Sequence, residues 1–230
     1  MDVELVRKHL ILFLLVGQDS TSSLLTSLTY LLTQHPEVED KLRQEVESVM
    51  GDSPPTMENI KQLTYTMAVI KETLRLYPPA QAIVKMCLKD TSLGPYRIKE
   101  GARVIVLVSE LQRNKECWGE TANEFDPSRF LPADATNANG PALEYAWMPF
   151  SSGSRACLGM QFSLIEARII LARMKQRFTF RLHKDARVKD KFRIFMKLSN
   201  MWVTAHDIQS NRNGLYLLLL LLLLLLCYCS

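Results

Sequence analysis

The ten residues Phe150–Gly159 read FSSGSRACLG and surround one cysteine, Cys157, with two glycines and an arginine. A free cysteine is most often a buried thiol that acts as a small hydrophobic residue. A catalytic nucleophile would need a base, and the histidines available are His9, His35, His183 and His206. A zinc or iron–sulfur site would need several cysteines, whereas no other cysteine lies near Cys157 in the sequence.

The neighbours of Cys157 favour a further possibility, a single thiolate ligand to a heme iron. Gly153 and Gly159 would let the backbone turn tightly and approach a flat macrocycle. The helix expected directly after this stretch has its positive end beside the sulfur, which favours the thiolate. Arg155 would pair with a heme propionate, and Phe150 would shield the sulfur from water.

The pattern Phe150-x-x-Gly153-x-Arg155-x-Cys157-x-Gly159 resembles the cytochrome P450 family, the heme-thiolate monooxygenases. The resemblance implies a fold that is mainly α with a small β component, and heme b with Cys157 as the axial ligand of its iron. It implies that one oxygen atom of dioxygen is inserted into an apolar small-molecule substrate. The electron donor would be a flavoprotein reductase or a ferredoxin. The order of segments is also similar to fatty-acid hydroxylases that are fused to their own reductase.

Composition is that of a globular protein, because 47% of the 230 residues are hydrophobic and 23% are charged. The net charge of +4 comes without a long basic run, so nucleic acid is not an indicated partner. Five cysteines without regular spacing and without a secretory signal predict reduced thiols inside a cell. The chain would be either cytoplasmic or membrane-associated.

Hydrophobic periodicity predicts one mostly helical domain over residues 1–208. A long helix from Asp2 to His35 should stop at Pro36, where a second helix begins and runs to Met50. We expect a short helix opening at Thr56–Glu58, longer ones at Tyr65–Leu76 and Met160–Phe178, strands within 81–90 and 96–108, a polar loop at 133–141, and a strand hairpin that joins 178–184 to 201–207. The last long helix should bury a face that carries Phe162, Ile165, Ile169 and Met174.

A Glu-x-x-Arg pair stands upstream of the cysteine, with Glu72 and Arg75 three residues apart on one helix face. Most such pairs are solvated surface salt bridges. In the family that this chain resembles, the pair joins a later arginine in a buried ion network beneath the heme loop. That resemblance assigns the third position to Arg129, in the segment FDPSRF.

The first helix carries polar residues in an apolar run, FLLVGQDSTSS, which includes Asp19 and Ser20. Glycine and back-bonded hydroxyls bend helices, which is one explanation for this run. The resemblance implies another, an oxygen-activation groove in which Asp19 and Ser20 relay protons. Val16 stands where the family usually has alanine or glycine, so it would narrow the groove.

The resemblance also implies roles for residues that follow Pro78 and Pro79. Lys85 stands where many members place a basic residue against a heme propionate, although an ordinary strand lysine is an equal alternative. Ala80, Ala82 and Ile83 would line the substrate side of the heme together with Val16.

The resemblance extends from about Met1 to Ile208 and corresponds to the second half of the family's domain. We therefore expect a truncated monooxygenase, with a non-catalytic fragment, or a heme-thiolate isomerase or dehydratase, as alternatives. The acid–alcohol pair disfavours the isomerase, which needs no proton relay. Residues 209–230 form a leucine-rich tail. As a helix, its apolar part would be about 21 Å long, short of a roughly 30 Å hydrocarbon core, so a short membrane anchor and a low-complexity repeat both stay open.

Overall fold

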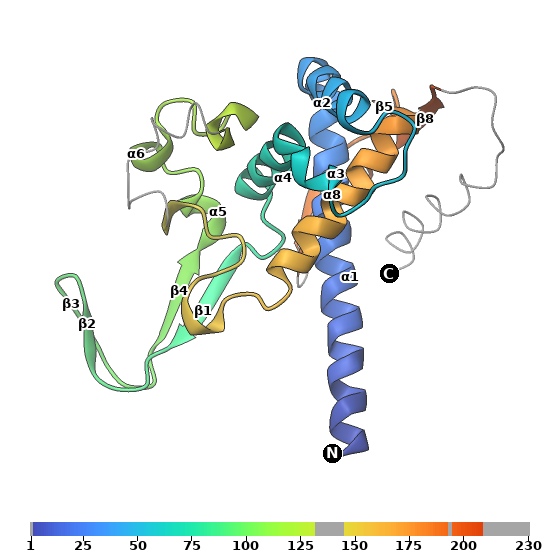
Figure 1. Cartoon of the computed structure of the whole chain (residues 1–230). Helices are drawn as coiled ribbons and strands as arrows, with labels where there is room; N and C mark the ends of the chain where they lie inside the picture. The colour runs from blue at the N-terminus through green and yellow to red at the C-terminus, as the bar shows by residue number, and fades with distance from the viewer. Residues whose placement is uncertain (1, 132–144, 193–194, 209–230) are drawn as a thin grey trace.

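The computed structural model describes residues 2–131, 145–192 and 195–208, and its architecture is mainly α with a small β component. The helices are α1 (Val3–Gln34), α2 (Pro36–Met50), α3 (Asn59–Gln62), α4 (Thr64–Leu76), α5 (Val108–Leu111), α6 (Lys115–Trp118) and α8 (Met160–Arg177), with 3-10 turns η1 (Pro127–Phe130) and η3 (Gly153–Arg155). The strands are β1 (Ala82–Met86), β2 (Thr91–Leu93), β3 (Tyr96–Ile98), β4 (Arg103–Leu107), β5 (Phe178–Leu182), β6 (Lys189–Phe192), β7 (Met196–Ser199) and β8 (Val203–Asp207). Figure 1 shows their arrangement.

Caps and a proline fix the ends of the first two helices. The Asp2 carboxylate accepts a hydrogen bond from the Glu4 amide at 3.0 Å, which satisfies one free N–H group of the first turn of α1. Pro36 cannot continue α1 because it lacks an N–H group, but it fits the first turn of α2. α2 ends at Gly51, whose φ of 51° favours glycine. Both expected helices are confirmed to within a residue at each end.

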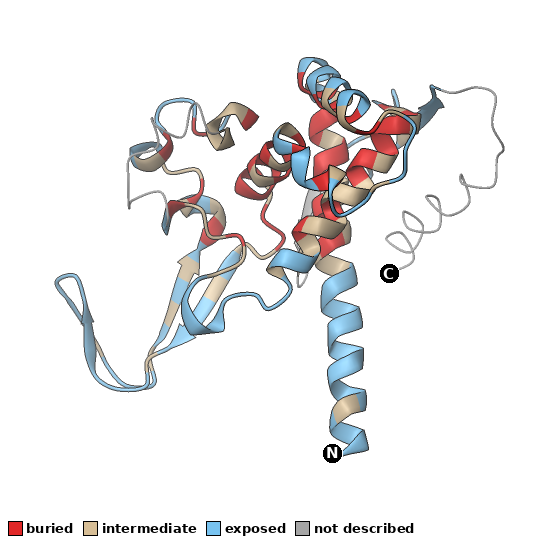
Figure 2. Cartoon of the chain, viewed as in Figure 1, coloured by how far each residue is buried: buried red, intermediate tan, exposed pale blue. Residues whose placement is uncertain are grey.

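The hydrophobic core lies between the second half of α1 and helices α2, α4 and α8 (red in Figure 2). Each helix contributes fully buried side chains to one cluster, among them Leu28, Leu42, Ile70 and Leu171. The first half of α1 extends beyond this core, and Leu14 there is 71% exposed. Among the described residues α1 is the one helix long and apolar enough to cross a membrane, a test that core helices also pass.

The strands form four antiparallel pairs, β1–β4, β2–β3, β5–β8 and β6–β7. The β1–β4 ribbon and the β2–β3 hairpin project away from the helical core (Figure 1), and Lys85 on β1 stands opposite Val104 on β4. β5 pairs with β8, as the sequence predicts, and the shorter β6–β7 hairpin lies between them in the chain.

One local expectation is wrong, the face that α8 buries. Phe162 is 72% exposed, while Ile165 and Ile169 pack partly buried against the core. The buried face of α8 is instead formed around Leu164, Ala167, Leu171 and Met174, because the first turn of α8 extends past the core. The short helix α3 begins at Asn59 with Glu58 at its N-cap, in agreement with the expected opening at Thr56–Glu58, and the Thr56 hydroxyl accepts a hydrogen bond from the Asn59 amide at 3.2 Å. The polar loop at 133–141 and the leucine-rich tail lie outside the described residues.

Candidate heme-thiolate site

The cysteine loop closes on itself through backbone hydrogen bonds. The Ser151 amide donates to the Met148 carbonyl at 3.1 Å, and the Cys157 amide donates to the Phe150 carbonyl at 2.9 Å. Ser151 and Gly153 have φ values of 63° and 79°, so the loop passes twice through the left-handed region. Glycine takes this conformation without steric cost, whereas serine does not.

The sequence predicts that Gly159 also allows a tight turn, but its φ is −85°, a value that any residue can adopt. A tight turn is therefore not what requires glycine there. A Cβ atom at this position would lie 3.9 Å from the Cys157 sulfur, in ordinary contact within the chain. Close approach to a macrocycle remains the prediction for Gly159.

The surroundings of Cys157 fit a flat apolar group with a charged edge. Cys157 is exposed, and it lies three residues before the 18-residue helix α8. Leu158 and Phe162 next to it are 86% and 72% exposed, an unusual state for large apolar side chains. Arg155 is exposed on the same loop. Heme offers an apolar macrocycle and propionates, so the residues fit the group.

Phe150 anchors the start of the loop rather than standing free. Its ring is partly buried and meets the Trp147 ring with centroids 6.2 Å apart. The Trp147 indole in turn donates to the Lys71 carbonyl of α4 at 3.1 Å. The loop is thereby fixed to α4 at its entry.

Glu72 and Arg75 lie together on α4, and both side chains are 0% exposed. Arg75 donates twice to the Glu72 carboxylate, from Nε at 2.6 Å and from Nη2 at 2.8 Å. Its three other N–H groups donate to the carbonyls of Gln112, Ala122 and Glu124. Every Arg75 donor is therefore satisfied, as a buried guanidinium requires.

Arg129 also reaches this pair. Its Nε lies 3.6 Å from Glu72 Oε1, beyond hydrogen-bond distance, while its Nη atoms donate to Trp118 and Thr121. The Asp126 amide donates to Glu72 at 2.9 Å. Burial raises the pKa of Glu72, and the hydrogen bond and charge of Arg75 oppose that rise.

The two residues predicted to relay protons, Asp19 and Ser20, lie in the middle of α1, and each has its own hydrogen-bond partner. The Ser20 hydroxyl donates to the Val16 carbonyl at 2.8 Å, a back-bond within the helix. The Asp19 carboxylate pairs with Lys197 Nζ of β7 at 2.5 Å. β7 is held there by Ser23, which donates to the Met196 carbonyl, and by the Met196 amide, which donates to Pro79 at 2.9 Å.

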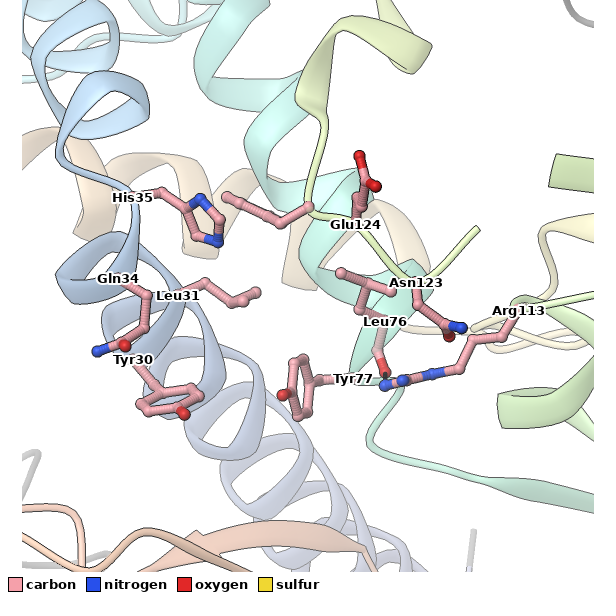
Figure 3. Close-up of a pocket in the computed structure, with 10 residues that line it drawn as sticks. Tyr30, Leu31, Gln34, His35, Leu76, Tyr77, Arg113, Asn123 and Glu124 are labelled. Atoms are coloured by element: carbon pink, nitrogen blue, oxygen red, sulfur yellow. Dashed lines mark hydrogen bonds between the residues drawn. The ribbon is translucent and has the colours of Figure 1, made fainter. Parts of the chain in front are cut away.

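The predicted substrate-side residues lie on two elements, Val16 on the exposed first half of α1 and Ala80, Ala82 and Ile83 at or just before the start of β1. Ala80 and Ile83 are partly buried, whereas Ala82 and Lys85 are exposed. A cavity of about 410 Å³ lies elsewhere, between the end of α1, the end of α4 and residues 123–125 (Figure 3). Its lining includes Tyr30, Tyr77 and Arg113 and none of the predicted site residues. Among the described residues, no group of three His, Cys, Asp or Glu side chains is placed to hold a metal ion.

Two residues that matter here escaped prediction from the sequence. Lys197 pairs with Asp19 across 178 positions, and Gln112 is a fully buried amide that contacts the segment before the cysteine loop. Neither carries a local sequence signal, because each contact is formed only by tertiary packing.

The structure thus places an exposed cysteine on a closed loop that is fixed to α4, the helix that carries the buried Glu–Arg pair. The chain belongs to the cytochrome P450 family, whose sequence model matches residues 1–201. It is 43% identical to secologanin synthase 2 of Catharanthus roseus over 169 residues, which cover 74% of this chain and 32% of that protein. It is 37% identical to bifunctional cytochrome P450/NADPH–P450 reductase 1 of Bacillus subtilis (strain 168), over 80% of this chain and 17% of that protein. It is 36% identical to a cytokinin hydroxylase of Arabidopsis thaliana, over 81% of this chain and 36% of that protein. The chain thus spans about a third of the length of the two plant relatives.

Proposed function

We propose that this chain supplies the thiolate ligand and the proton-handling residues of a cytochrome P450 monooxygenase, which inserts one oxygen atom of dioxygen into an apolar organic substrate. The observation that carries the proposal is the exposed Cys157 thiol on a loop of the family's pattern. Names of relatives such as cytokinin hydroxylase support a hydroxylation-type reaction. The domain would extend over residues 1–208.

Heme b, when bound, supplies an iron that activates dioxygen, and the thiolate donates electron density to that iron. Cys157 would hold the iron, while Arg155 and Lys85 would pair with the propionates. Phe150, Leu158 and Phe162 would help to keep water from the sulfur once the macrocycle covers this surface. Gly153 gives the loop its left-handed turn, and Gly159 leaves room for the macrocycle.

Asp19 would receive protons from solvent, and Ser20 would pass them on toward the bound dioxygen. The partial exposure of both residues suits exchange with water. Lys197 orients the Asp19 carboxylate through its ion pair. Val16, Ala80, Ala82 and Ile83 would line an apolar substrate space.

Electrons would come from a flavoprotein reductase or a ferredoxin. The Bacillus subtilis relative carries a reductase in its own name, which supports the flavoprotein. The net charge of +4 suits an acidic donor. The chain would be intracellular, and it would be membrane-associated if the leucine-rich tail serves as a short anchor or cytoplasmic if the tail is a low-complexity repeat.

A second function is favoured by one observation, the exposed apolar first half of α1. A chain that leaves this surface uncovered would be a non-catalytic fragment. An isomerase or dehydratase that needs no electron donor is the further alternative.

The test is to reconstitute the chain with heme, reduce it and add carbon monoxide. A thiolate-ligated iron gives a strongly red-shifted Soret band. Cys157→Ala should abolish that band, whereas Cys87→Ala, which removes a thiol bound to the Lys89 carbonyl, should retain it. Survival of the band in Cys157→Ala would refute the ligand assignment. A wild-type chain that takes up no heme would support the non-catalytic fragment.

A further inference from the structure

Gln112 is a completely buried polar side chain directly after α5, and it joins three separate segments. Its Nε2 donates to the carbonyls of Leu74 and Arg75 at 3.0 and 2.9 Å, at the end of α4. Its Oε1 accepts a hydrogen bond from the Met148 amide at 2.8 Å. Its backbone carbonyl accepts from Arg75 Nη1 at 2.9 Å.

Burying an amide is unfavourable unless its hydrogen bonds are made, so such a side chain persists where its bonds are formed. Both Nε2 hydrogens of Gln112 are used, and so is its oxygen. The carbonyls at the end of a helix have no partner within the helix, and Gln112 supplies one for two of them. The side chain therefore connects the end of α4 to the segment that enters the cysteine loop.

From Met148 the connection continues to the cysteine itself. The Met148 carbonyl accepts from the Ser151 amide, and the Phe150 carbonyl accepts from the Cys157 amide. Gln112 is thus linked to Cys157 by hydrogen bonds and a few backbone bonds. Trp147 provides a neighbouring attachment to α4 through Lys71, so two contacts hold the same entry segment.

We propose that Gln112 is a positioning residue for the thiolate ligand. It holds the Met148–Cys157 loop against α4, so that the Cys157 sulfur keeps a fixed position relative to α4. This inference rests on the proposed role of Cys157. Gln112 does not touch the reacting atoms and acts through the backbone of the loop.

Gln176 offers a matched control. It is also buried, its Nε2 also donates to two backbone carbonyls, those of Gly51 and Ser53, and its Oε1 also accepts one hydrogen bond, from Arg173. It lies in the last turn of α8, away from the cysteine loop in sequence and in contacts. Gln112→Met and Gln176→Met remove the same groups and retain a similar apolar volume.

The first readout needs no heme. Amide hydrogen exchange in the full chain should be on the order of tenfold faster at Met148, Ser151 and Cys157 in Gln112→Met, because a buried amide has lost its partner. Gln176→Met should leave exchange at these three amides near the wild-type value. Equal exchange at the loop in the two variants would overturn the proposal. If Gln112→Met does not fold, Gln112→Glu serves, since a carboxyl group buried at this place is expected to be protonated, so that it retains the oxygen that the Met148 amide uses and loses one of the two donors. Gln112→Glu should keep slow exchange at Met148, and fast exchange there would count against the proposal.

The second readout is the spectrum of the reduced, carbon-monoxide-bound protein. Gln112→Met should lower the ratio of thiolate-ligated to unligated or neutral-donor heme by about tenfold, whereas Gln176→Met should leave that ratio unchanged even if it lowers stability. An unchanged ratio in Gln112→Met would overturn the proposal. If the wild-type chain shows no thiolate band, the heme assignment fails, and the amide exchange still decides whether Gln112 holds the loop.

Discussion

Replacing Glu72 by glutamine tests how much of the fold depends on the buried pair. The carboxylate accepts three hydrogen bonds, two from Arg75 and one from the Asp126 amide, through two oxygen atoms. The amide of Glu72→Gln has one oxygen, and its NH2 group would face a donor. At least one donor is then unpaired, and the Arg75 charge, 0% exposed, loses its counter-ion. Breaking one partner of a buried pair costs about 3–5 kcal/mol, a large part of a typical unfolding free energy of about 5–15 kcal/mol.

The assay is urea unfolding of the full chain followed by circular dichroism. Glu4→Gln is the matched control, because Glu4 and Arg7 have the same three-residue spacing and the same paired contacts, at 2.9 and 2.8 Å, on the exposed surface of α1. It should leave the midpoint unchanged. Adding Arg75→Met to Glu72→Gln should restore part of the lost stability, since the uncompensated charge is then removed. If Glu72→Gln lowers the midpoint no more than Glu4→Gln does, the buried pair does not carry this stability and the reasoning is refuted.

Three further outcomes follow from single residues. Ser151→Gly should raise the unfolding free energy by about 0.5–1 kcal/mol, because serine is held at a φ of 63°; a lower urea midpoint would contradict this. Burial raises the pKa of Tyr65 to about 12, so between about pH 10 and pH 12 the folded chain keeps a proton that the unfolded chain releases, and stability should fall as the pH rises. In Tyr65→Phe the unfolding free energy should fall less steeply between about pH 10 and pH 12. If it falls as steeply as in the wild type, another group is responsible. In an enzyme completed with a related first half, Ser20→Ala should lower product formed per electron and raise peroxide release while Ser20→Thr retains coupling; unchanged coupling in Ser20→Ala would mean that protons arrive by another route.

Local signals predicted much of this fold. The Pro36 boundary and the apolar spacing of α2 and α4 depend on neighbours within a few residues, and those elements appear where expected. Phe162 shows the limit of periodicity, because an apolar residue at the right spacing is buried only if the core extends to that turn. The i, i+3 spacing of Glu72 and Arg75 likewise predicts that they meet, but not that five backbone and side-chain groups surround them.

The candidate site also contains some residues that a local sequence pattern indicates and others that only tertiary packing brings together. Cys157 and its loop form a local pattern, so the sequence alone indicates them. Gln112 and Lys197 are ordinary polar residues in the sequence, and their contacts join segments 36 and 178 positions apart. Such contacts depend on how α4, α5 and β7 pack, which no local spacing encodes.

The residues that stabilise this chain and the residues proposed to do its chemistry are separated by burial. Glu72, Arg75 and Gln112 are fully buried, and each has hydrogen-bond partners that a substitution would leave unpaired. Cys157 and Arg155 are exposed, so their removal takes away few contacts within the chain. Substitutions of the exposed pair should therefore abolish or weaken heme binding at nearly constant stability. Substitutions of the buried three should lower stability and ligation together, because Arg75 donates to the Gln112 carbonyl and Gln112 in turn bonds to Met148 at the entry of the loop. This separation makes unfolding and ligation measurements, taken side by side, able to distinguish a residue that binds the cofactor from one that builds its support.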